Sequence, residues 1–412
     1  MDISGEGIGR ISLNDRVLMA SRIYYSVMTY FVNWNVISSN NFDDWFESYL
    51  NEVIDNDDRY SFDMHTMEFL AKLKSGNTAF VDNWLNKQYN QAMPFELGHF
   101  PDCWHVRRSA IRGLPPGSTV EKINGIAFEE FYNSMKKRVS SFGDIESRTK
   151  FSESYYLFPN EFVLETSDGP FKIKREKSHY FFPKAIEGYW LERNKTAYIR
   201  IRQFSKSIEE DAIDYVKEFF DSKRLIIDVR ENTGGTTPLG LIKKLMDNRF
   251  GFWRESTPMG IGLMKFYSEF LKNNHDSLPP SVVDKMSLSE IFSNPEMSWG
   301  PELIENEKNH YDGDIFIIAD RYSRSSAEDF MLPFKESGRA TIVGEATMGS
   351  NGQAYSYAFK NGMQLFIDIK KEAFPDGSRF QGIGIMPDHG VRQSLDDMRN
   401  GVDAPLEFCL GI

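Results

Sequence analysis

The spacing of hydrophobic residues changes twice along this chain of 412 residues. In residues 1–95, apolar and aromatic side chains recur at helical spacing, which predicts an N-terminal helical segment. Residues 96–183 combine short apolar runs with turn residues, which predicts a β-rich domain. From there, in residues 184–412, buried strands alternate with amphipathic helices, and this order is typical of a layered α/β core.

One strand-to-helix turn in the α/β part carries candidate chemistry. Residues 314–319 predict a buried strand, a helix is predicted from residue 330, and Ser323, Ser325 and Ser326 stand between them. Hydrolases place a nucleophilic hydroxyl at such a turn because it lifts the side chain off the sheet, and the helix N-terminus offers amides to an oxyanion. The alternative is that these serines only cap the helix, and this segment by itself favours the cap.

A second turn follows the strand predicted at residues 224–229. Gly234 and Gly235 lack a Cβ, so the backbone amides of this turn can closely approach a reacting group. An ordinary tight turn is the alternative. Asp228 and Arg230 are predicted to form a structural ion pair that shapes the same loop.

Composition and charge narrow the classes of function. The formal net charge of −12 argues against nucleic-acid binding, because no basic stripe is present to meet phosphates. Cys103 and Cys409 are the only cysteines, so the sequence indicates neither a disulfide framework nor a metal-ligand motif. No apolar run reaches the roughly 18 residues that predict a membrane span. No signal peptide is visible, so we expect a cytoplasmic protein, or an exported one if a signal peptide has been removed.

Four motifs occur in order within residues 186–391. They are Asp-Val-Arg-Glu-Asn-Thr-Gly-Gly at 228–235, Ser-Ser-Ala-Glu at 325–328, Gly-Arg-Ala…Gly-Glu-Ala-Thr-Met-Gly at 338–349 and Gly-Ile-Gly-Ile-Met-Pro-Asp at 382–388. Each motif alone is unspecific. Together they resemble the tail-specific, or C-terminal processing, serine peptidases, and in particular their tricorn-core-like branch, which uses a Ser–His pair.

The resemblance implies a core like that of crotonase and Clp protease, with an inserted PDZ-like domain at 96–183. The stretch at 113–125 is similar to the carboxylate-binding part of such domains. The resemblance further implies a serine endopeptidase that acts on peptides or proteins without a metal ion or organic cofactor. Ser325 would be the nucleophile, and the amides of Ser326 and of Gly234 or Gly235 would stabilise the oxyanion. The oligomeric state stays open.

The sequence departs from this family at the general base. Where the tricorn-like branch has its His, this chain has Asn77, and where some members have an orienting Glu, it has Gln381. The Lys of the processing-protease branch is replaced by Ser350 or Asn351. A neutral Asn can hydrogen-bond to a hydroxyl but cannot take its proton. We therefore predict little or no peptidase activity, with Asn77 lying within side-chain reach of Ser325.

Three explanations compete for the missing base. The chain is a natural pseudo-peptidase, its His has been replaced on purpose, or the base comes from elsewhere. Candidates for the last explanation are His65, His99 and His105, although a structural role is favoured for each.

Two other functions remain beside the peptidase hypothesis. One is a catalytically silent peptide-binding module that uses the same cleft and the PDZ-like domain. The other is an acyl-CoA enzyme with the same layered core, which no basic pocket motif supports. The irregular aromatic region at 250–310 is either a lid over the cleft or plain packing.

Overall fold

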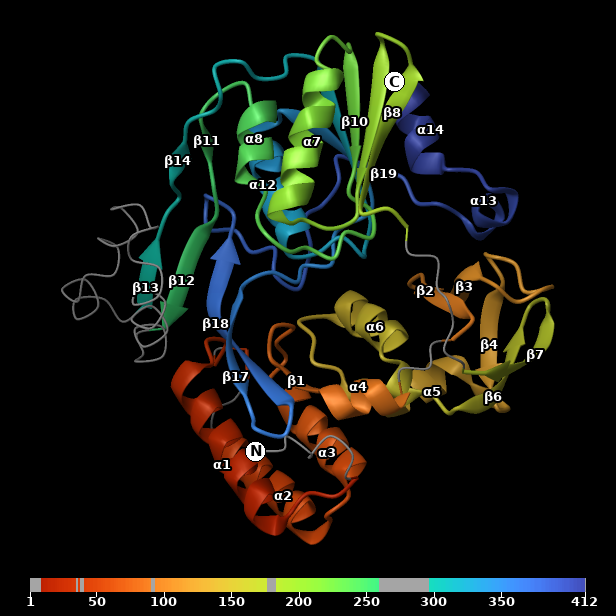
Figure 1. The fold of residues 1–412 in the computed structure, drawn as a ribbon, viewed down its shortest axis with the longest axis vertical. Coiled ribbons are helices and arrows are strands. Elements are labelled where there is room, and N and C mark those ends of the chain that lie inside the picture. Colours follow the sequence, from red (N-terminus) through yellow and green to blue (C-terminus); the bar gives the residue numbers. More distant parts are fainter. Residues whose placement is uncertain are drawn as a thin grey trace.

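The computed structural model describes residues 9–34, 36–37, 41–89, 93–175, 183–258 and 296–411. Its elements form three groups (Figure 1). A mostly parallel sheet with flanking helices lies at one end of the molecule, and the N-terminal helices lie at the other. A separate β-rich group sits beside them.

The central sheet has the strand order β19-β16-β15-β10-β9-β8. Its strands are β8 (Ile186–Glu192), β9 (Thr196–Ile201), β10 (Arg224–Asp228), β15 (Asp314–Ala319), β16 (Ala340–Gly344) and β19 (His389–Gly390). Neighbouring strands are parallel, except that β8 runs antiparallel to β9. This arrangement confirms the predicted α/β class.

Helices cover both faces of the central sheet (Figure 1). One face packs against α7 (Lys206–Glu218), α8 (Leu239–Leu245) and α12 (Ser326–Ser337), and the other packs against α14 (Ala404–Gly411). Because both faces are buried, the central strands β10 and β15 are nearly continuous apolar runs.

A second sheet joins the N-terminal segment to the core. Its long strand is β18 (Met363–Ala373), and its other strands are β1 (Ala79–Asp82), β12 (Arg254–Pro258), β13 (Glu296–Trp299) and β17 (Gln353–Ala358). The strands β12 and β13 come from the ends of the 250–310 region, of which residues 259–295 lie outside the described residues. β1 corrects the expectation of an all-helical N-terminal segment, because it pairs antiparallel with β18.

The N-terminal segment is otherwise helical. It contains α1 (Leu13–Tyr30), α2 (Phe42–Asp55), α3 (Arg59–Ala71) and the short α4 (Asn83–Tyr89). The side chains of Ser12 and Asp58 accept hydrogen bonds from the first turns of α1 and α3, which fixes where these helices begin.

The β-rich group, which we call the β2–β7 module, spans residues 95–174. Its sheet contains β2 (Phe95–His99), β3 (Trp104–Ser109), β4 (Thr119–Ile123), β5 (Ile126–Ala127), β6 (Glu161–Thr166) and β7 (Gly169–Lys174). Its helices include α5 (Phe128–Met135) and α6 (Asp144–Glu153). Asn124 and Gly125 form a tight hairpin turn between β4 and β5, and both have positive φ, at 50° and 81°.

Aromatic packing holds α6 inside the module. The Phe151 ring lies 5.7 Å from that of Trp104 and 4.9 Å from that of Phe158. The same hydrophobic cluster continues into α1, α2 and α3. The module and the N-terminal helices therefore share one core.

No helix in the described ranges is both long enough and apolar enough to cross a bilayer. Cys103 and Cys409 are free thiols.

A buried carboxylate organises the end of β10. Asp228 is fully buried and accepts hydrogen bonds from Tyr198 (2.6 Å), Arg200 (2.6 Å) and Arg230 (2.6 Å). Burial opposes its ionisation, but Arg230 and Arg200 outweigh this effect and lower its pKa well below the usual range. Arg230 also pairs with Asp403. The predicted pair of Asp228 and Arg230 is confirmed.

We expect Asp228→Asn to lower the free energy of unfolding by about 3–5 kcal/mol, because it leaves two buried guanidinium groups without their shared partner. Asp214→Asn is the matched control, since Asp214 pairs with Lys217 on the exposed side of α7 and its loss should cost less than about 1 kcal/mol. Urea unfolding of both variants measures the difference. Equal costs would contradict the organising role of Asp228.

Candidate active site

Ser325 lies between β15 and α12 in a backbone conformation that serine rarely adopts. Its φ is 56° and its ψ is −123°, and such a conformation costs about 1–3 kcal/mol for a residue other than glycine. Ser325 occupies the N-cap position of α12, but its side chain accepts no capping hydrogen bond. The helix-cap hypothesis is therefore wrong for Ser325.

Neighbouring loops hold this turn in place. The Ser325 amide donates to the Ser350 carbonyl (3.0 Å), and the Arg324 amide donates to the Asn232 carbonyl (3.0 Å). These two acceptors belong to the loops that follow β16 and β10. The strained turn is thus stabilised by contacts that exist only when both loops are in place.

The turn with Gly234 and Gly235 lies directly against Ser325. A Cβ at Gly234 would be 2.5 Å from the Ser325 Cβ, so only glycine allows this approach. The Gly234 amide donates to Asn232 Oδ1 (2.8 Å) and is not free for an oxyanion. Within the described chain, the amides of Gly235 and Ser326 donate no hydrogen bond. The geometry therefore favours Gly235 and Ser326 among the predicted donors.

Asn77 and Gln381 converge on one backbone carbonyl. Asn77 Nδ2 and Gln381 Nε2 donate to the Asn351 carbonyl at 2.9 Å and 2.5 Å. The preceding carbonyl, that of Ser350, accepts the Ser325 amide. No hydrogen bond between described residues joins the side chains of Asn77 and Ser325, and the dipeptide 350–351 links them instead.

Asp368 is a buried acid beside Asn77 that the sequence analysis missed. It lies on β18, and its Oδ2 accepts from Asn33 Nδ2 (2.7 Å) and Ser75 Oγ (3.1 Å). Burial raises its pKa to about 7, although hydrogen bonds from Ser75, Asn77 and Asn33 oppose the rise. One acid in the apolar stretch 365–369 is the signal that could have revealed it.

The three candidate histidines do not contact Ser325 through any interaction of the described residues. His99 Nε2 is hydrogen-bonded to Thr149 Oγ1 (3.1 Å), and burial lowers its pKa to about 2. Burial likewise lowers the pKa of His105 to about 3. His65 pairs with a glutamate on the surface of the N-terminal helices. These surroundings favour the structural role for each histidine.

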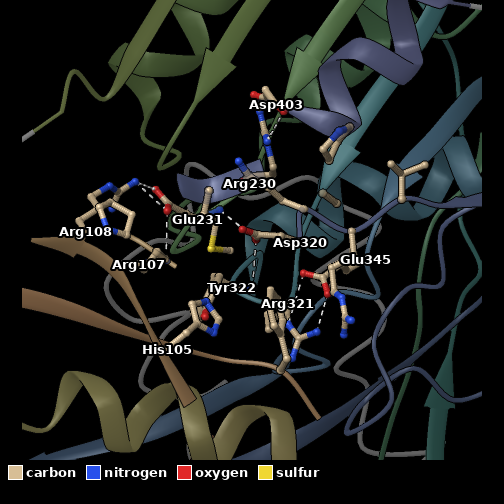
Figure 2. A pocket seen from close by; sticks show the side chains of 18 of the residues that line it. His105, Arg107, Arg108, Arg230, Glu231, Asp320, Arg321, Tyr322, Glu345 and Asp403 are labelled. Carbon is tan, nitrogen blue, oxygen red and sulfur yellow. Dashed lines mark hydrogen bonds and ion pairs between the residues drawn. The ribbon is translucent and has the colours of Figure 1, made fainter. Parts of the chain in front are cut away.

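A polar pocket of about 310 Å³ lies at the carboxyl edge of the central sheet (Figure 2). Arg107 and Arg108 of the module reach across it to Glu231, at 3.0 Å and 2.6 Å. Burial opposes ionisation of Glu231, but these arginines outweigh it and lower the pKa to about 2. The Glu231 amide donates to Asp320 (3.0 Å), the first residue after β15. This pocket therefore ties the module to the loops after β10 and β15.

Two buried acids follow Ser325 on the first turn of α12. Glu328 Oε1 accepts from Thr347 Oγ1 (2.6 Å) and the Gly349 amide (2.6 Å), and burial raises its pKa to about 8. Asp329 Oδ1 accepts from Asn351 Nδ2 (2.7 Å), and burial raises its pKa to about 7. Both acids fix the loop that receives the Ser325 amide.

In the part of the chain that is described, no group of three His, Cys, Asp or Glu side chains is arranged to hold a metal ion.

Sequence comparison confirms the resemblance that the four motifs predict. Residues 195–391 match the model of peptidase family S41. Proteins named "Probable CtpA-like serine protease" from strains of Staphylococcus aureus are 26% identical over 223 residues, which is 53% of this chain and 36% of theirs. The chain thus aligns with little more than a third of the length of these relatives.

Structure comparison extends the likeness to the whole chain. Mature CPAF bound to lactacystin has a TM-score of 0.71, with 12% identity and 97% coverage of both chains. The photosystem II D1 C-terminal processing protease has a TM-score of 0.54, with 17% identity and 97% coverage of both. The tricorn protease has a TM-score of 0.51 at 15% identity and covers 97% of this chain, but only 36% of its own. At these identities the likeness concerns the fold.

We expect Gly234→Ala to lower the free energy of unfolding by about 3 kcal/mol, because a Cβ there combines a positive φ of 84° with a clash against Ser325. Gly338→Ala is the matched control at the other end of α12. It has a similar φ of 70° but meets no atom within 4 Å, so only the conformational cost of about 1–2 kcal/mol applies. Equal urea midpoints would contradict the close packing of the two loops.

We expect the contribution of Glu328 to the free energy of unfolding to decrease as the pH rises from about 4.5 to about 8. Its carboxyl has a usual pKa of 4.5 when unfolded and about 8 when folded, so only the native state holds the proton in this window. Stability therefore decreases as the pH rises, by up to about 1.4 kcal/mol per pH unit. Glu328→Gln should show a flatter decline in urea unfolding measured from pH 4.5 to 9. An identical slope would contradict the raised pKa.

Proposed function

We propose that this chain is a serine-type endopeptidase of the C-terminal processing kind. Its residues 195–391 match the model of peptidase family S41. The observation that carries this proposal is the strained Ser325 turn, in which neither the Ser325 hydroxyl nor the amides of Gly235 and Ser326 form a hydrogen bond with any described residue. Peptides or proteins are the proposed substrates, and the β2–β7 module is the proposed PDZ-like peptide-binding domain.

The proposed reaction proceeds through an acyl-enzyme. Ser325 Oγ attacks the peptide carbonyl carbon while its proton passes to a base, and the negative charge on the carbonyl oxygen is stabilised by the amides of Gly235 and Ser326. The C–N bond then breaks as the leaving amine takes a proton, and water hydrolyses the Ser325 ester. Catalysis by such a base contributes about 10²–10⁴-fold, so a chain without one is expected to be slow.

Position 77 is the proposed site of the general base. The Asn77 side chain lies between the Asn351 carbonyl and the buried acid Asp368. A histidine at this position would find Asp368 available to orient its ring and to stabilise its charged form, as an acid does in other serine peptidases. Asp368 would thus take the orienting role that the neutral Gln381 cannot fill.

A catalytically silent peptide-binding protein is the second candidate function. The observation that favours it is that Asn77 and Gln381 both donate to the backbone carbonyl of Asn351. These amides stabilise the loop and transfer no proton. In this case the cleft would retain peptides without cleaving them.

We expect Asn77→His to raise hydrolysis of a fluorogenic peptide by about 10²-fold or more, because an imidazole can take the Ser325 proton. Asp368→Asn in the same background should reduce this gain, and Ser325→Ala should abolish it. If the unchanged chain hydrolyses the peptide, retains this activity in Asn77→Ala and loses it in Ser325→Ala, position 77 is not the base site.

Labelling with a fluorophosphonate probe separates the two candidate functions. Covalent modification at Ser325, located by peptide mass spectrometry, supports the peptidase. Peptide binding without labelling, both in the unchanged chain and in Asn77→His, supports the binding protein.

A further inference from the structure

The helix α6 lies on the side of the β2–β7 module toward the central sheet (Figure 1). It is firmly part of the module, since Phe151 packs on Trp104 and Thr149 bonds with His99. A movement of the module can reach the candidate site through α6 only if the opposite side of this helix contacts the site.

Glu146 makes that second attachment. Its side chain is fully buried, and its Oε1 accepts from Ser350 Oγ (2.7 Å) and pairs with Lys150 Nζ (2.8 Å). Its Oε2 accepts from the Phe142 amide (2.6 Å). A buried carboxylate depends on such partners, because losing one leaves charge in a medium that solvates it poorly. Ser350 and α6 are therefore strongly constrained to stay together.

The ion pair of Glu146 and Lys150 also contacts the turn that carries Asn77. Lys150 Nζ donates to the carbonyl of Gly76 (2.6 Å), the residue before Asn77. A Cβ at Gly76 would lie 2.1 Å from Glu146 Oε1, so this backbone packs directly on the carboxylate. One side chain pair thus touches both the loop of Ser350 and the turn of Asn77.

Both ends of α6 add contacts to the remaining site segments. Just before α6, a Cβ at Gly143 would lie 3.0 Å from the carbonyl of Gly382, the neighbour of Gln381. At its C-terminal end, Glu153 pairs with Arg324 (3.1 Å), the residue before Ser325. Each of the four segments that carry the predicted site residues at 77, 325, 350 and 381 therefore contacts α6 or the residues just before it.

We propose, on the basis of the function proposed above, that Glu146 is a positioning residue that couples the β2–β7 module to the nucleophile. It holds Ser350, and the Ser350 carbonyl holds the Ser325 amide. Through Lys150 it sets the turn of Asn77 at the same time. A peptide that shifts α6 when it binds the module therefore moves the nucleophile and the base position together.

Hydrogen exchange of the full chain tests this coupling without requiring activity. Glu146→Gln should increase exchange about tenfold in the peptides that contain Ser325 and residues 349–352. Asp144→Asn is the matched control, because the exposed Asp144 also lies on α6 and pairs with Arg148, which contacts Trp104 and Glu129 of the module. Unchanged exchange in Glu146→Gln, with the protein still folded by circular dichroism, would overturn the proposal.

Fluorophosphonate labelling in the Asn77→His background supplies the second readout. Glu146→Gln should slow labelling of Ser325 about tenfold and Ser350→Ala by no more than this, and the double variant should be no slower than Glu146→Gln alone, because Ser350 lies on one of the two paths that start at Glu146. A purely structural role predicts additive losses and parallel decreases in melting temperature. Additive losses would overturn the proposal.

The two proposals fail in different ways. If Asn77→His shows no labelling at all while Glu146→Gln still changes exchange around Ser325, the peptidase function fails and the coupling stands. If labelling occurs and Glu146→Gln changes neither labelling nor exchange, the peptidase function stands and the coupling fails.

Discussion

Two consecutive carbonyl groups, those of Ser350 and Asn351, hold the candidate site together. The first accepts the Ser325 amide, and the second accepts the side chains of Asn77 and Gln381. Because a carbonyl oxygen has two lone pairs, one dipeptide can serve several segments of the chain at once. The strained Ser325 turn and the side chains of Asn77 and Gln381 therefore all depend on the placement of this one loop.

Buried acids fix that loop from several sides. Glu328 binds the Gly349 amide, Asp329 binds the Asn351 side chain, and Glu146 binds the Ser350 hydroxyl. Burial raises the pKa of Glu328 and Asp329, because a low-dielectric interior disfavours their charged forms. The site thus rests on a network of buried hydrogen bonds, which favours one well-defined geometry.

The neutral amides at positions 77 and 381 fit this geometry without strain. Each keeps the shape and hydrogen bonding of the loop but cannot carry a proton between Ser325 and a leaving group. The buried acid Asp368 lies beside Asn77, within the same group of hydrogen bonds.

The sequence by itself determined the alternation of strands and helices and the turn that carries Ser325, because these follow from local periodicity and from residues next to one another in the chain. Only the tertiary structure decided that β1 pairs with β18, which brings Asn77 to Asn351 and to Asp368. It likewise placed Glu146 of α6 against Ser350. Such contacts join residues roughly 200 to 300 positions apart, and no local pattern encodes them, since they form only when three separately patterned segments pack into one core.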